Sequence, residues 1–130
     1  MDQAYAVLQT SDLGQNLSRE DFQQLSSLMQ VKHFTQNTSL FHQDSIAQSV
    51  YLVTDGVVRV DKLSMRGRRQ VVAFLFAGDF IGLTRNECYE YSATTLIPSN
   101  VLEASHDEFL QLSDACIQLK RNLSQISDHV

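Results

Sequence analysis

Residues 49–60 read SVYLVTDGVVRV, two runs of β-branched and aromatic residues on either side of a turn. Val, Tyr and Thr favour strands, and glycine takes a positive φ without steric cost, so Thr54-Asp55-Gly56 predicts a tight reversal of the chain. The alternation in residues 58–61 predicts a second strand with one face in water. This stretch therefore predicts two antiparallel strands.

The same pattern of short strand-length segments extends along most of the chain. Each segment is rich in β-branched or aromatic residues and is followed by polar or glycine-containing punctuation. The predicted strands are VKHF (31–34), TSLF (38–41), SVYLVT (49–54), GVVRVDKL (56–63), RQVVAFLF (69–76), YSATTL (91–96) and VLEAS (101–105). Many short strands joined by turns favour a sandwich, jelly roll or small barrel.

A helix is predicted before the first strand. Ser18 can cap it, and Asp21 lies in its first turn, where an acidic side chain is favoured. Phe22, Leu25 and Leu28 recur at helical spacing, so we expect them to face the core.

Composition limits the function classes. The chain has 130 residues, a formal net charge of −5 and two cysteines without metal-ligand spacing, Cys88 and Cys116. Those cysteines are expected to be reduced thiols, and no metal site is predicted. A domain that wraps DNA usually has a basic face, so DNA contact is expected only through a part of the protein outside these residues. No apolar run is long enough to cross a bilayer, and we expect a cytoplasmic protein without membrane contact.

A second helical region is predicted from about His106 onward. Its apolar residues follow the 4, 3, 4, 3, 4 spacing of a coiled-coil seam, which favours a homodimer through this helix. The alternative is one amphipathic helix that packs on its own domain. The seam residues are Leu112, Cys116, Leu119, Leu123, Ile126 and Val130. No stop signal follows them, so a continuation of the chain is expected.

This order of elements, together with FAGDFIGL (76–83), resembles the cyclic-AMP receptor protein / fumarate-nitrate regulator family. The resemblance covers roughly residue 17 to the end. It implies a mainly β fold with flanking helices, a β-roll (a double-stranded, jelly-roll-like β-helix) followed by a long dimerisation helix. Residues 1–112 would form a cyclic-nucleotide-binding-like sensor domain with an N-terminal helix, and 113–130 would begin the dimerisation helix. A DNA-binding helix-turn-helix domain would lie downstream.

Cyclic-nucleotide binders of this family carry a cassette that begins Gly-Glu-Leu and ends Arg-Ser/Thr-Ala. Its glutamate holds the ribose and its arginine pairs with the phosphate. Here Leu83 stands at the glutamate position and Tyr91 at the arginine position, and the segment between them is shorter. Leucine cannot accept a hydrogen bond and tyrosine cannot neutralise a phosphate, so cyclic AMP is not expected to bind in the usual way. The candidate pocket residues are Gly82, Leu83, Thr84, Arg85, Tyr91, Ser92, Ala93 and Thr94.

Two of these candidates have alternative explanations. Arg85 could offer a bidentate fork to an anion, but a solvated loop arginine paired with Glu87 or Glu90 is the simpler interpretation. The hydroxyls around Ser92 and Thr94 more often satisfy nearby backbone than a ligand, although they are the next candidates for polar groups in the pocket.

Other cofactors and functions fit the sequence less well. Residues 1–30 contain no cysteine, so the iron–sulfur cluster of one family branch is not expected, and four scattered histidines do not predict haem. Cys88 beside Glu87 is not expected to be reactive, because neighbouring acids disfavour a thiolate. Cupin, hydrolase and nucleotide-hydrolase motifs are missing, so an enzyme is not predicted. The basic hairpin tip, Arg66, Arg68 and Arg69, is expected to be a solvated turn. Docking to RNA polymerase is the alternative.

Two hypotheses remain. The first is the sensor domain of a bacterial transcription regulator with an unknown signal. The second is a ligand-free module that dimerises or docks partners, with Leu83 and Tyr91 filling the pocket.

Overall fold

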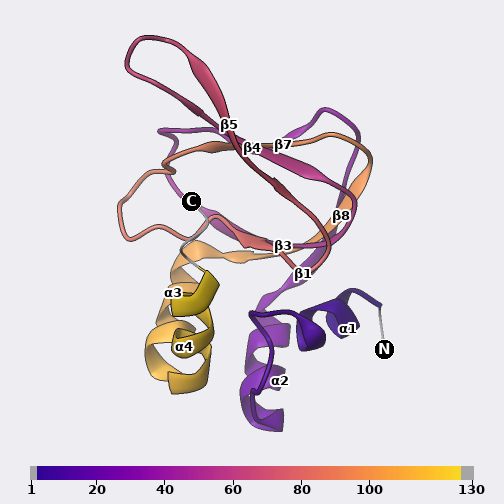
Figure 1. The fold of residues 1–130 in the computed structure, drawn as a ribbon. Coiled ribbons are helices and arrows are strands. Elements are labelled where there is room, and N and C mark those ends of the chain that lie inside the picture. The colour runs from indigo at the N-terminus through magenta and orange to yellow at the C-terminus, as the bar shows by residue number, and fades with distance from the viewer. Residues whose placement is uncertain (1–2, 127–130) are drawn as a thin grey trace.

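In the computed structural model, residues 3–126 are described, and they form two four-stranded antiparallel sheets with four helices along one side (Figure 1). One sheet has the strand order β1-β8-β3-β6 and the other β2-β7-β4-β5. The helices are α1 Gln3–Thr10, α2 Arg19–Leu28, α3 His106–Ala115 and α4 Ile117–Ile126. The strands are β1 Gln30–Phe34, β2 Ser39–Phe41, β3 Ser49–Asp55, β4 Val58–Leu63, β5 Arg69–Leu75, β6 Phe80–Ile81, β7 Ser92–Thr95 and β8 Ser99–Ser105. The predicted β-rich fold with flanking helices is therefore confirmed.

All seven predicted strands are present, and the predicted cap of α2 is confirmed: Ser18 Oγ accepts a hydrogen bond of 3.1 Å from the Asp21 amide. The two-residue β6 and the helix α1 were not predicted from the sequence. Strand β6 is too short to show a period, and α1 buries only Ala4 and Leu8 among the residues of its eight-residue span.

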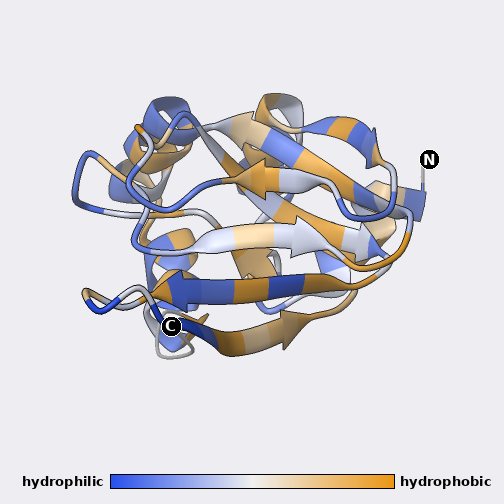
Figure 2. Cartoon of the chain, turned by 90° about the horizontal axis from the view of Figure 1, so that it is seen from above, coloured by the Kyte–Doolittle hydropathy of each residue, from blue (hydrophilic) through white to orange (hydrophobic). Residues whose placement is uncertain are grey.

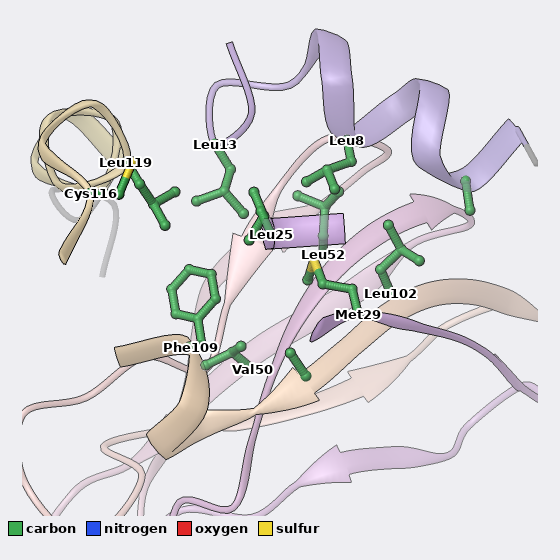
Figure 3. Close-up of a cluster of buried hydrophobic side chains, with 12 residues drawn as sticks. Leu8, Leu13, Leu25, Met29, Val50, Leu52, Leu102, Phe109, Cys116 and Leu119 are labelled. Atoms are coloured by element: carbon green, nitrogen blue, oxygen red, sulfur yellow. The ribbon is translucent and has the colours of Figure 1, made fainter. Parts of the chain in front are cut away.

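Strand β3 separates two apolar cores because successive side chains point to opposite faces. Tyr51 and Val53 face the core between the two sheets, whereas Val50 and Leu52 face the helices. Figure 3 shows the second core, in which side chains from every helix converge on β3 and β8. Its fully buried members include Leu8, Leu25, Phe109 and Leu119, one from each helix. The helices are thus held on the roll by one continuous core.

The single long helix expected from about His106 is wrong. The chain leaves the helix at Cys116, where the backbone is extended (φ −119°, ψ 108°), and α4 starts anew with the Lys120 amide bonded to the Cys116 carbonyl. A 4, 3, 4, 3 spacing is met equally well by two short helices that present the same face, so the pattern could not reveal the break. Cys116 and Leu119 are buried in the chain's own core, and Leu112, Leu123 and Ile126 pack against it. Val130 lies outside the described residues.

The expectation of a wet face along β4 is wrong at Asp61. The register of β4 against β5 shifts between Val60 and Asp61, which pair with Ala73 and Val71, so β5 carries an extra residue there. Arg59 Nε lies 3.2 Å and Arg69 Nε 3.9 Å from the Asp61 carboxylate, whose side chain is only 8% exposed. Two arginines therefore cover a carboxylate that the alternating sequence pattern predicted to be exposed to water.

Strand β5 forms the free edge of its sheet and remains apolar on exposed positions. Figure 2 shows it as an almost continuously orange strand at the lower edge of the view, next to the alternating β4. Val71, Phe74 and the following Phe76 are each about half exposed, and Met65 at the hairpin tip is fully exposed. The hairpin that joins β4 and β5 extends beyond the rest of the roll (Figure 1).

Candidate functional site

The cassette begins at a glycine that no other residue could replace without strain. Gly82 follows β6 with φ +106°, and a Cβ there would lie 3.0 Å from the Ser49 carbonyl oxygen and 3.3 Å from the Val50 Cα. Positive φ and the close approach to β3 both favour glycine. This position fixes the direction in which Leu83 and the insert leave the sheet.

The insert that follows, residues 84–91, is anchored rather than freely solvated. It runs beside the β2–β3 connection, where the Asp44 amide donates to the Tyr89 carbonyl (2.8 Å) and the Ala47 amide to the Glu87 carbonyl (2.9 Å). Cys88 forms an isolated bridge with Ile46, so the thiol lies in a paired segment.

Tyr89 is the main anchor of the insert, and no sequence pattern singles it out. Its ring stacks on Phe41 at 3.9 Å between centroids, and its hydroxyl donates to the Ser49 carbonyl (2.6 Å) and accepts from the Ser49 amide (3.1 Å). Burial raises the pKa of the Tyr89 hydroxyl. Tyr89 therefore joins the insert to the core between the sheets.

A cavity of about 860 Å³ lies between β5, the cassette and α4. Five of the predicted pocket residues line it, namely Gly82, Leu83, Thr84, Arg85 and Tyr91. Leu123 and Ile126, which the heptad pattern assigned to a dimer seam, line it as well. The predicted pocket residues Ser92, Ala93 and Thr94 do not line this cavity.

The hydroxyls of Ser92 and Thr95 satisfy nearby backbone, which for Ser92 was the simpler of the two interpretations. Ser92 Oγ accepts from the Gln43 amide at 2.8 Å, and Thr95 Oγ1 donates to the Thr35 carbonyl at 2.6 Å. The buried positions of β7 are Ala93 and Thr95, whereas Ser92 and Thr94 are half-buried.

Two backbone amides of the insert have acceptors within the chain. The Thr84 amide donates to Nε2 of His106 (3.1 Å), and the Asn86 amide donates to the Thr84 hydroxyl (3.0 Å). His106 is the first residue of α3, and its ring is buried. No sequence pattern distinguishes His106 from the other three histidines.

Leu83 and Tyr91 stand at the two positions that the family resemblance assigns to the ribose-binding glutamate and the phosphate-binding arginine. Leu83 packs against the core between the helices and strands β3 and β8. Tyr91 packs against the core between the two sheets. Burial raises the pKa of the Tyr91 hydroxyl, and a hydrogen bond with the Gly82 backbone acts in the opposite direction. Tyr91 is thus a neutral residue bound to the start of the cassette.

Arg85 is paired, but with a partner other than those expected. Its guanidinium lies 3.5 Å from Oδ1 of Asp114 on α3, and Lys120 Nζ of α4 lies 3.9 Å from the same oxygen. Glu90 instead accepts from the Asn86 side chain at 2.8 Å. Glu90, Asn86 and Lys120 line the cavity and were not selected from the sequence, because only folding brings them to it.

The comparisons with known proteins agree with this geometry. The family profile described as "Cyclic nucleotide-binding domain" matches residues 31–116. The chain belongs to this family. The domain is 28% identical over 121 residues to the nitrogen fixation regulation protein FixK of Bradyrhizobium diazoefficiens, covering 93% of this chain and 51% of that protein. It is 32% identical over 95 residues to the transcriptional activatory protein AadR of Rhodopseudomonas palustris, covering 73% of this chain and 40% of that protein.

The fold of a catabolite activator protein is also shared. The crystal structure of the Thermus thermophilus protein superposes with a TM-score of 0.77 at 24% identity, covering 88% of this chain and 55% of that one. Together these similarities confirm the resemblance to the cyclic-AMP receptor protein / fumarate-nitrate regulator family. The domain spans about half or less of the length of the two named regulators. None of the helices within residues 3–126 combines the length and apolarity needed to cross a membrane.

Proposed function

We propose that this domain is the sensor part of a cytoplasmic, dimeric transcription regulator and that it does not bind cyclic AMP in the usual way. The printed names of its relatives, a nitrogen fixation regulation protein and a transcriptional activatory protein, support the regulatory role. DNA contact is assigned to a part of the protein outside these residues, since the domain itself is acidic, with a net charge of −5.

The observation that carries the ligand part of the proposal is the chemistry of the cassette. Leu83 and Tyr91 replace the ribose-binding and phosphate-binding groups, and two insert amides already have acceptors in the chain. A phosphate placed there would lose its hydration without gaining a cationic partner from the arginine position.

The cavity favours a sensor over a ligand-free module. A volume of about 860 Å³ remains open although Leu83 and Tyr91 line it, and it lies within the size range of small-molecule sites. In the ligand-free alternative the domain's own side chains fill the pocket, and Leu83 and Tyr91 were the candidates for filling it.

The same cavity offers a route for the signal. Its walls come from the cassette and from α4, and the insert is bonded to α3 through Thr84–His106 and Arg85–Asp114. A ligand that contacts both walls would stabilise one arrangement of α4 relative to the roll, and an equilibrium shifts only by such differential contacts. Movement of α4 would then reach the downstream part of the regulator.

Calorimetric titration of the folded domain with cyclic AMP and cyclic GMP tests this proposal. We expect no saturable heat for either nucleotide at millimolar concentration. A Kd in the micromolar range for either one would overturn the claim about the cassette.

A second candidate function, docking of a partner protein, is favoured by the exposed apolar side chains of β5. Val71, Phe74 and Phe76 are each about half exposed along a free sheet edge, and exposed apolar patches of this kind mark interaction sites.

The dimer that is part of the proposed function has its own test, sedimentation velocity over a concentration series. A self-associating domain would show a sedimentation coefficient that rises with concentration.

A further inference from the structure

The walls of the cavity are largely apolar. They are built from three parts of the chain that the fold brings together: β5, the cassette and α4. The apolar side chains that carry the inference are Phe74, Leu75, Phe80, Leu83, Leu123 and Ile126. Phe74 is 51% and the adjacent Val72 is 40% exposed, so part of this wall still faces solvent. Covering exposed apolar area is favourable in proportion to the area removed from water.

The cations beside the cavity have spare hydrogen-bonding capacity. Arg85 and Lys120 both line it, and both approach the same oxygen, Oδ1 of Asp114, at 3.5 and 3.9 Å. An arginine offers five N–H donors and a lysine three, so a single shared oxygen leaves most of this capacity for water or a ligand. Both side chains are more than 60% exposed, which keeps them free to turn toward an incoming group.

The carboxylates that line the cavity are bonded within the chain. Asp79 Oδ2 accepts from the Phe76 amide at 2.8 Å, and Glu90 Oε1 accepts from the Asn86 side chain at 2.8 Å. Each of these carboxylates is held in place by a neutral donor of its own segment. Arg85 and Lys120 instead meet at one oxygen of Asp114, so an acceptor-rich anionic end can reach two cations at one place.

We propose that the cavity binds a small molecule with an apolar body and one carboxylate, the body against β5 and α4 and the carboxylate at Arg85 and Lys120. The inference rests on the proposed function, since it treats the cavity as the sensor site. A single carboxylate fits better than a phosphodiester, because the cassette amides of Thr84 and Asn86 are already engaged. Contact with both Lys120 and Ile126 would connect the ligand directly to α4.

A matched pair of probes tests the proposal. Naphthalene-2-carboxylate and naphthalene-2-methanol have the same aromatic body and differ in the charge of the head group. Calorimetry at neutral pH should give a Kd about tenfold lower for the carboxylate, the factor that one charge-assisted hydrogen bond would supply. Nuclear Overhauser contacts from the naphthalene protons to the methyl groups of Leu123 and Ile126 should locate the probe.

The double variant Arg85→Ala/Lys120→Ala should abolish the preference for the carboxylate and leave the affinity for the alcohol within about twofold. The control is Arg66→Ala/Arg68→Ala, which removes the same charge from the hairpin tip, where both residues are exposed and neither lines the cavity. This control should keep the preference.

Each outcome separates the inference from the proposed function. Equal affinity for the two probes would overturn the anionic head group and leave an apolar sensor cavity. Failure of both probes to bind would overturn the ligand class, while the negative result with cyclic nucleotides would still stand. Micromolar binding of cyclic AMP would instead overturn the proposed function itself.

Discussion

The backbone amide of Thr84 donates a 3.1 Å hydrogen bond to Nε2 of His106, the buried first residue of α3. Nε2 can accept only when it carries no proton, so the ring proton lies on Nδ1, which faces the Asp107 carboxylate at 3.5 Å. This bond connects the start of the cassette insert directly to the helices. It gives a change in the insert a direct route to α3.

Replacement of the buried His106 by leucine should destabilise the domain by about 1–3 kcal/mol, because the half-buried Thr84 amide loses its acceptor. Urea unfolding measures the loss, and hydrogen exchange of the Thr84 amide should become faster. His106→Gln is the control, since its side-chain oxygen can accept from the same amide and should restore part of the protection. If leucine and glutamine variants exchange at the same rate, the bond does not hold the insert.

The strands could be predicted from the sequence because a short local pattern is enough to indicate each one. The site could be predicted only in part. Gly82, Leu83 and Tyr91 could be placed by their position in a recognisable cassette. Lys120 reaches the cavity, and His106 reaches the insert, through tertiary packing alone. The break in the helix at Cys116 could not be predicted for a related reason. The spacing of apolar residues indicates which face is buried, but it does not indicate whether the helix is interrupted.

Asn122 should be an important anchor of α4. Its side-chain amide is buried and donates to the carbonyls of Leu13 (2.8 Å) and Gln15 (2.9 Å). Asn122→Leu keeps a similar volume but leaves both carbonyls without this donor, so we expect a loss of about 2–3 kcal/mol in urea unfolding. Gln118→Ala removes only a bond to the Asn122 side-chain oxygen and should cost less than about 1 kcal/mol. Equal losses for the two variants would contradict an anchoring role.

The two arginines beside Asp61 should differ in their contribution to stability. Arg59 lies 3.2 Å from the carboxylate and its side chain is 30% exposed, whereas Arg69 lies at 3.9 Å and is 68% exposed. Arg59→Ala should therefore destabilise the domain by about 1–2 kcal/mol, because Asp61 is shielded from water and loses its closest cation. Arg69→Ala should cost less than about 0.5 kcal/mol, as is typical of exposed pairs. Thermal unfolding of the two variants checks the order, and a larger effect for Arg69 would refute it.

Three tyrosines around the core between the sheets predict a loss of stability at alkaline pH. Burial raises the pKa of Tyr51, with Glu103 adding to it, and burial also raises the pKa of Tyr89 and Tyr91. An unfolded tyrosine ionises near pH 10, so below that pH neither state is charged and the stabilisation is fully present. Above it the unfolded state loses protons that the folded state retains. Each such tyrosine then lowers the free energy of unfolding by up to about 1.4 kcal/mol per pH unit, until it ionises in the folded state as well.

Tyr51→Phe isolates one of these contributions. The variant also loses the hydrogen bond from the Tyr51 hydroxyl to the Leu40 carbonyl (3.2 Å), which should lower stability by about 1 kcal/mol at every pH. That offset does not change the slope. Urea unfolding between pH 9 and pH 12 should therefore show a shallower decline for the variant than for the unmodified chain. Parallel curves would mean that Tyr51 ionises at the same pH in the folded and unfolded states, against the effect of its burial.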